Sequence, residues 1–358
     1  MAKIRDEIGG DFDWQWPRET GTRLSWPQGS VFYSTGRSFL AAVCRTVAGA
    51  TRRSRLWIPS YFCQEVVEHL RFAACSLAFY EDYPDWPAPD FDSLKSQPGD
   101  LVLAVNYFGV RQAAPWNTWR SVAPGVVLIE DHTHDPWSLW ARSSEADYAF
   151  ASLRKTLPIP DGALVWSPRG LVIPEPAEGT HRGSAIRLAG MMRKRIYLQS
   201  TGNGTRLKES FRSMQRNGEL LLCNQDAPHM SEWAETLLAS GAPSHFRARR
   251  ENNVQALLRL VPRSDLAEPL FDSWPEGHCP FNPVLLFRQP SDRESARTLL
   301  INADIYAPVH WPIPHAQSGR ALDLSLRLLT IPVDYRCEES QLERVASVFN
   351  ALGSPITK

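Results

Sequence analysis

Short apolar runs alternate with amphipathic stretches through the first half of the chain. Residues 29–47 predict a strand, a Ser-Thr-Gly turn and a helix, and residues 54–73 repeat this plan, with Pro59 and Ser60 as break and cap. The near-continuous apolar runs within 100–110 and 125–135 predict strands buried on both faces. Further strands are expected within three ranges, 75–82, 146–155 and 162–168. This alternation predicts an α/β fold with a mostly parallel sheet between helices.

Polar residues follow several of these predicted strands. In parallel sheets a ligand binds at the carboxyl ends of the strands, so we expect a site where these segments meet. The segments are Ser34–Arg37, Pro59–Phe62, Asn106–Tyr107, Asp131–His134 and Ser152–Lys155.

The second half of the chain has a different pattern. Helices are expected within 182–199, 226–240 and 250–261, followed by a strand in 280–287 and a helix in 292–303. A last helix is expected in 338–352, and the whole predicts a small α+β domain. We assign residues 1–250 to a large domain, with an N-terminal arm at 1–30, and residues 251–358 to a small C-terminal domain.

Composition narrows the class of protein. The chain has 358 residues, 43% apolar and 22% charged, which is typical of a soluble globular protein. The formal net charge is zero, which removes the electrostatic argument for binding nucleic acid or an anionic membrane. The six cysteines have no metal-ligand spacing, and no stretch of eighteen apolar residues occurs. We therefore expect a reduced, cytoplasmic protein without a metal.

One lysine is notable because the chain has six lysines among 39 lysines and arginines. Lys155 follows a predicted strand, and Ser152 lies three residues before it. Asp131 ends an earlier apolar run, and His134 lies three residues after it. Each residue alone has an ordinary explanation, as a helix cap, a polar core residue or a solvated loop lysine. Together, at successive strand ends, they indicate a site.

Pyridoxal phosphate chemistry needs this set of groups. A lysine amine forms a Schiff base with the aldehyde, and a carboxylate keeps the ring nitrogen protonated. Hydroxyl and backbone N–H groups, preferably at a helix N-terminus, bind the phosphate. Lys155, Asp131 and Ser152 supply these groups, together with the turn at 34–37, where Gly36 allows close approach of the backbone. Arginine could not replace the lysine, because its guanidinium stays protonated.

The chain resembles a divergent branch of the DegT/DnrJ/EryC1/StrS family of fold-type I pyridoxal-phosphate enzymes, mostly sugar aminotransferases. The resemblance is carried by "EIGGDFDW", "YSTGRSFL", "WIPSYFCQEVVEHL", "VLIEDHTHD", "SLRKTLPIPDGAL" and "IYAPVHWPIP…LTIPVDYR". It implies the family's fold: a large domain with a mostly parallel sheet between helices and a small C-terminal α+β domain. The chain also departs from the family pattern at two positions. Ala163 follows Gly162 where a second glycine is common, and Phe150 replaces a serine.

The resemblance also implies roles for individual residues. Lys155 would bind the cofactor covalently, Asp131 would pair with the ring nitrogen, and His134 would lie near the phenolic oxygen. The other implied contacts are with the phosphate (Thr35, Gly36, Arg37 and Ser152), with the ring face (Tyr61 or Phe62, since Cys63 occupies the usual position) and with the substrate (His310). Arg250, Asn252 and Asn253 resemble a loop that enters the neighbouring subunit's site.

The function expected from this resemblance is amino-group transfer from an amino-acid donor to a keto acceptor, with a sugar or nucleotide sugar as the family's usual acceptor. We expect small-molecule substrates and a homodimer, without nucleic acid or membrane partners. Two alternatives stay open on the sequence. One is a pyridoxal-phosphate lyase or dehydratase acting on a sugar, and the other is a non-catalytic descendant that binds a ligand or regulates a partner.

Overall fold

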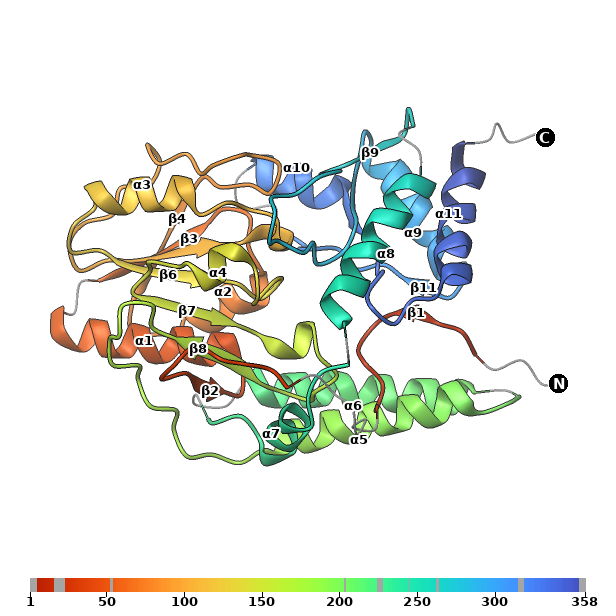
Figure 1. Cartoon of the computed structure of the whole chain (residues 1–358), viewed down its shortest axis with the longest axis horizontal. Helices are drawn as coiled ribbons and strands as arrows, with labels where there is room; N and C mark the ends of the chain where they lie inside the picture. Colours follow the sequence, from red (N-terminus) through yellow and green to blue (C-terminus); the bar gives the residue numbers. More distant parts are fainter. Residues whose placement is uncertain are drawn as a thin grey trace.

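The computed structural model describes residues 5–15, 23–51, 54–202, 204–223, 228–243, 245–261, 264–314 and 319–353. Within these ranges, seven strands form the main sheet in the order β2-β8-β7-β6-β5-β3-β4 (Figure 1). The strands are β2 (Val31–Tyr33), β3 (Arg55–Pro59), β4 (Ser76–Tyr80), β5 (Leu101–Val105), β6 (Val127–Asp131), β7 (Tyr148–Ala151) and β8 (Ala163–Trp166).

Strand direction explains why one edge of this sheet collects the polar segments. Strands β3 to β7 are all parallel, whereas β8 is antiparallel to both of its neighbours, β7 and β2. The two reversals make β2 parallel to β7. The carboxyl ends of β2, β3, β5, β6 and β7 therefore meet at one edge, and the prediction of a mostly parallel sheet is confirmed.

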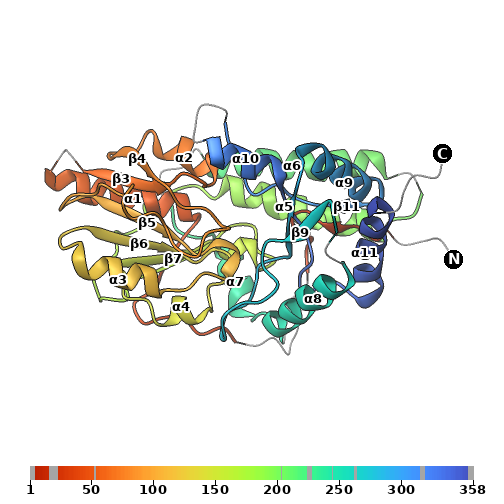
Figure 2. The same ribbon diagram turned by 90° about the horizontal axis from the view of Figure 1, so that it is seen from above.

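Helices cover both faces of the sheet (Figure 2). Helices α1 (Gly36–Thr51) and α2 (Gln64–Leu70) lie on one face, and α3 (Ala114–Val122) and α4 (Leu139–Arg142) on the other. Strand β5 is buried along its whole length, as its apolar run predicts. The prediction that Ser60 caps α2 is wrong, because α2 begins at Gln64 and Cys63 occupies its N-cap position.

Two long helices lie side by side at the lower right of Figure 1. They are α5 (Arg182–Gln199) and α6 (Thr205–Cys223), and the shorter α7 (Glu232–Ala239) follows. The sequence predicts α5 but not α6. The two helices approach closely because both have glycine at their contact: a Cβ atom on Gly218 would lie 2.9 Å from the Gly183 carbonyl oxygen.

The C-terminal part is built around a second, antiparallel sheet. Its described strands are β9 (Ala267–Pro269), β10 (Val284–Phe287) and β12 (Leu328–Thr330), in the order β12-β10-β9. Around them lie α8 (Phe246–Leu260), α9 (Pro290–Asn302), α10 (Gly319–Arg327) and α11 (Glu339–Gly353). The boundary predicted at residue 250 falls inside α8, and α10 is not predicted by the sequence.

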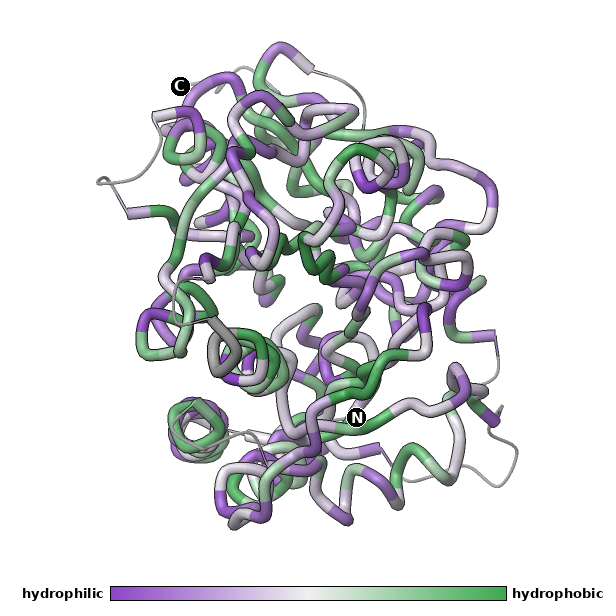
Figure 3. Tube along the Cα trace, turned by 90° about the vertical axis from the view of Figure 1, so that its left-hand side faces the viewer, coloured by the Kyte–Doolittle hydropathy of each residue, from purple (hydrophilic) through white to green (hydrophobic). Residues whose placement is uncertain are grey.

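The N-terminal arm crosses to this second part. Strand β1 (Ile8–Gly9) pairs in parallel with β11 (Ile305–Tyr306), and Ile8 is buried in the C-terminal core. The arm, assigned from the sequence to the large domain, thus stabilises the smaller one. Strongly hydrophobic segments lie toward the middle of the molecule (Figure 3). No helix in the described ranges combines the length and apolar character needed to cross a bilayer.

Candidate active site

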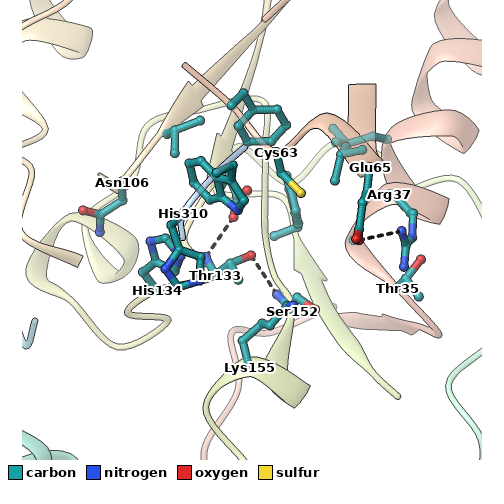
Figure 4. A pocket seen from close by; sticks show the side chains of 18 of the residues that line it. Thr35, Arg37, Cys63, Glu65, Asn106, Thr133, His134, Ser152, Lys155 and His310 are labelled. Carbon is teal, nitrogen blue, oxygen red and sulfur yellow. Dashed lines mark hydrogen bonds and ion pairs between the residues drawn. The ribbon is translucent and has the colours of Figure 1, made fainter. Parts of the chain in front are cut away.

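A cavity of about 100 Å³ lies where the strand ends meet (Figure 4). Segments after β2, β3, β5, β6 and β7 all contribute to its wall, together with residues of the C-terminal part. Each of the five polar segments predicted from the sequence places at least one residue in this wall. Figure 4 shows His134 and His310 on one side, Thr35 and Arg37 on the other, and Lys155 below them.

Lys155 ends η2 (Leu153–Lys155), a single helical turn that follows β7 directly. Its side chain is exposed at the cavity, and no described residue forms a hydrogen bond or ion pair with its ammonium group. The neighbouring positive charge of Arg154, followed by partial removal from water, lowers the pKa of Lys155. A lysine with a lowered pKa and no partner is available as a nucleophile or base.

Thr133 links Asp131 and Ser152 through hydrogen bonds. The Thr133 N–H donates to Asp131 Oδ1 at 2.8 Å, and the Ser152 N–H donates to Thr133 Oγ1 at 3.1 Å. All three residues line the cavity, at the ends of β6 and β7. Burial raises the pKa of the Asp131 carboxyl, so this group gains from a cationic partner inside the cavity.

His134 is fixed by a backbone donor and flanked by flat rings. The Phe108 N–H donates to His134 Nδ1 at 2.9 Å, so the neutral ring carries its proton on Nε2. The imidazole stacks on Phe281 at 4.6 Å and 21° and on Trp311 at 5.8 Å and 11°. Burial, with the charges of His310 and Lys155, lowers the pKa of His134 well below its ordinary value.

The C-terminal part closes the cavity with His310, Trp311 and Phe281. His310 Nδ1 lies 2.9 Å from Thr330 Oγ1, and burial lowers its pKa to about 3. His310 is predicted from the sequence, whereas the two aromatic residues are not. Trp311 is adjacent to His310 in the same proline-rich segment, which is the signal that could have found it.

The opposite side of the cavity is the start of α1. The N–H groups of Ser38 and Phe39 donate to Thr35, whereas those of Gly36 and Arg37 have no partner among the described residues. A Cβ atom on Gly36 would lie 2.6 Å from the Phe150 ring, so the position requires glycine. Phe150, which replaces the expected serine, therefore packs directly against the backbone of this turn.

The residues expected at the ring face do not all line the cavity. Phe62 and Cys63 line the cavity, whereas Tyr61 is fully buried behind it and donates to the His310 carbonyl. Trp311 contacts Phe62 with ring centroids 5.8 Å apart. The aromatic surface at this wall thus comes from two different parts of the chain.

Arg250 and Asn252, like Tyr61, are candidates that the structure does not bring to the cavity wall. They lie within α8 rather than in a loop, and the expectation that they enter the neighbouring subunit's site stays a prediction. Arg250 is 2% exposed; its Nε donates to Cys279 Sγ at 3.3 Å and its Nη2 lies 3.7 Å from Asp135. Asn252 is exposed, and neither residue belongs to the cavity wall in the described part of the chain.

Comparison with known proteins finds likeness in structure rather than in sequence. No protein-family model and no curated protein sequence matches this chain. The aminotransferase TlmJ from Streptoalloteichus hindustanus is similar over 90% of this chain and 85% of its own, with 15% identity and a TM-score of 0.64. The PLP form of the putative sugar aminotransferase Spr1654 from Streptococcus pneumoniae covers 90% and 86%, with 11% identity and a TM-score of 0.63.

A third similar structure is S. venezuelae DesV in complex with a ketimine intermediate. It covers 91% of this chain and 85% of its own, with 15% identity and a TM-score of 0.58. At such identities the likeness shows the fold alone. The chain has the fold of these aminotransferases, and the predicted fold class is confirmed.

Proposed function

We propose that this chain is a pyridoxal 5'-phosphate-dependent aminotransferase that belongs with the DegT/DnrJ/EryC1/StrS proteins. The observation that carries the proposal is the Lys155 amine, exposed at the cavity without a partner among the described residues and close along the same sheet edge to the Asp131 carboxyl. A lysine and a carboxyl group are the two side chains that this cofactor requires.

The residues of the cavity fit this cofactor in three further respects. Gly36 and Arg37 offer free backbone N–H groups at the start of a 16-residue helix, which suits a phosphate. The buried Asp131 carboxyl, whose pKa is raised, suits a protonated ring nitrogen. Phe62 and Trp311 offer flat apolar surfaces for a ring.

When bound, pyridoxal phosphate supplies an aldehyde for a lysine amine and a ring that accepts electrons from the donor's α-carbon. Lys155 would hold the cofactor and, once released by the amino donor, would move the α-proton as general base and then as general acid. Its lowered pKa favours the neutral amine that this work requires. Asp131 would keep the ring nitrogen protonated, and His134 would donate through Nε2–H.

The acceptor is proposed from the similar proteins. Spr1654 is described as a putative sugar aminotransferase, and DesI was solved in the presence of its TDP-sugar product. We propose a keto sugar, free or nucleotide-linked, as the acceptor here and an amino acid as the donor. A homodimer in the cytoplasm is part of the same proposal and follows from the family resemblance.

The decisive experiment compares wild type with Lys155→Ala after incubation with pyridoxal phosphate. Wild type should show a visible absorption band and lose it when a productive amino donor is added. Lys155→Ala should show no such band and lose at least about 10³-fold in transamination, because the covalent link and the base are both removed. Lys95→Ala, a change in a loop outside the cavity, is the control. A Lys155→Ala protein with the wild-type spectrum and turnover would refute the proposal.

A further inference from the structure

Two cysteines that are distant in the sequence meet in the core of the large domain. Cys44 belongs to α1, and Cys75 is the residue before β4; these elements and α2 lie together at one end of the molecule (Figure 2). Cys75 Sγ donates to the Cys44 carbonyl oxygen at 3.5 Å, across 31 positions of sequence. Both belong to one hydrophobic cluster, with Val67 and Leu70 of α2. We call Cys44 and Cys75 the cysteine pair.

The two thiol groups of the pair also interact with each other. A hydrogen bond with the Cys75 side chain, followed by burial, raises the pKa of Cys44. The same hydrogen bond is the main cause that lowers the pKa of Cys75. All six cysteines of the chain lie in the described ranges and are free, and none of the other four has a second thiol among the main groups that shift its pKa. The contact between thiols is therefore specific to this pair.

The two members of the pair differ in how an oxidant can reach them. Cys44 is 0% exposed within a 16-residue helix, so access to it requires opening of the core. Cys75 is 4% exposed, but it ends the turn at 71–75 and lies between two exposed residues, Ala74 and Ser76. The thiolate is the form of cysteine that reacts. Its lowered pKa and its place in a surface turn make Cys75 the first of the two to react.

We propose that the cysteine pair is a reversible redox site, which closes a disulfide between α1 and the residue before β4. A hydroperoxide transfers one oxygen atom to the Cys75 thiol, which becomes a sulfenic acid, while the peroxide is reduced to water or an alcohol. The Cys44 thiol then attacks this sulfur atom, the hydroxyl group leaves with the thiol proton as water, and the S–S bond forms. A dithiol reductant restores both thiols.

The proposed bond closes a loop that carries part of the cavity wall. Strand β3 and helix α2 lie between the two cysteines, together with Phe62, Cys63 and Glu65 of that wall. A disulfide across this loop removes conformational freedom from the unfolded chain and so stabilises the folded one. Neither Cys44 nor Cys75 belongs to the described wall, so the inference is independent of the proposed function.

The test treats reduced wild type with hydrogen peroxide, removes the excess with catalase and alkylates the remaining thiols under denaturing conditions. Wild type should lose two of its six free thiols, and peptide mapping without reductant should find Cys44 joined to Cys75. The Tm of the cross-linked protein should rise by roughly 3–8 °C and return to its first value after dithiothreitol. Both readouts are independent of cofactor and of activity.

Two variants separate the roles within the pair. Cys44→Ala should leave Cys75 as a sulfenic acid, which dimedone traps at that position. Cys75→Ala should slow the oxidation of Cys44 about tenfold or more, because the buried thiol then lacks the partner that reacts first. Cys337→Ala is the matched control: it removes a buried cysteine outside the pair and should form the disulfide as wild type does.

A peptide map in which Cys75 stays reduced while other thiols are oxidised, or in which it pairs with another cysteine, would overturn the inference. A cross-link that lowers the Tm would also overturn it, because the native packing would then not accommodate the bond. These wild-type measurements decide the question if a variant does not fold. Equal oxidation of Cys44 in wild type and in Cys75→Ala would contradict the proposed order of reaction.

Discussion

Two cavities of this molecule differ in size and in the state of their charged groups. The larger, about 940 Å³, lies between the N-terminal arm, α5, α7 and the segment before α11, whereas the candidate active site measures about 100 Å³. In the larger one, Lys194 is 4% exposed and donates to the Gly9 and Asp11 carbonyls at 3.3 and 2.5 Å. In the smaller one, Lys155 is exposed and has no partner among the described residues.

The chemistry of the charged groups, rather than the volume of the cavity, identifies the site. Asp13 in the larger cavity is 3.2 Å from Arg195, so this pair already neutralises itself. Asp131 in the smaller cavity accepts from Thr133 but has no ion-pair partner among the described residues. Paired ions hold elements together and gain little from a ligand, whereas groups left without partners are available to bind one.

The largest expected difference is in the rate of the amino-donor half-reaction between variants of Asp131 and of Asp13. Asp131→Asn should slow the amino-donor half-reaction by about 10²–10³-fold, because an amide cannot keep the ring nitrogen protonated, while its oxygen can still accept from Thr133. Asp13→Asn should leave that rate within about twofold and lower the unfolding free energy instead. Stopped-flow absorbance and chemical denaturation measure the two effects. Equal rates in the two variants would remove the distinction between the cavities.

A smaller effect is expected in the pH dependence of stability. Burial, first of all, lowers the pKa of Lys194 from 10.5 to about 8, so between these values the unfolded chain binds more protons than the folded one. The unfolding free energy of wild type should therefore rise relative to that of Lys194→Met from pH 8 to pH 10.5, by roughly 2–3 kcal/mol.

Lys208 provides the control for this measurement. Its ion pair with Glu7 and its bond with the Tyr306 hydroxyl raise the pKa of Lys208 against the opposing effect of burial, so it stays protonated through the same interval. Lys208→Met should accordingly show no such rise between pH 8 and pH 10.5. A flat difference for Lys194→Met would mean that its ammonium is as well stabilised as in water.

The smallest expected effect is a difference in labelling. Both lysines have a lowered pKa, so an acetylating reagent near pH 8 tests access and hydrogen bonding instead. Lys155 should react several-fold faster than Lys194, whose hydrogen bonds and burial hinder attack. Peptide mass spectrometry measures both sites in one sample, and pyridoxal phosphate should protect Lys155 alone. Faster labelling of Lys194 would reverse the comparison.

The strand ends were predictable because buried parallel strands leave a strong apolar pattern. Strand β5 is buried throughout, and its run predicts both the strand and the polar Asn106 at its end. Asp131 and Lys155 were found in the same way, since each follows such a run. Arg250 and Asn252 were placed by resemblance, and the structure puts them in α8, whose helical pattern the sequence also showed.

Glu219 could not be assigned from the sequence, because its partners come from positions 37, 154 and 187. Helix α6, which carries it, was not predicted, although Phe211, Gly218 and Leu222 form its buried side. A glutamate on a largely polar helix has the pattern of a solvated residue. Only the packing of α6 beside α5 brings it among three arginines.

The amino-acid sequence specifies the strand ends, because apolar periodicity and the residues that interrupt it are local properties of the chain. It thereby determined Lys155, Asp131 and His134 as candidates. Which groups stay without partners depends on the tertiary structure: it pairs Lys194 with carbonyls, places Trp311 beside His134, and gathers Arg37, Arg154 and Arg187 around Glu219. Partners depend on contacts between distant segments, and the free energy of a charged group depends on those partners.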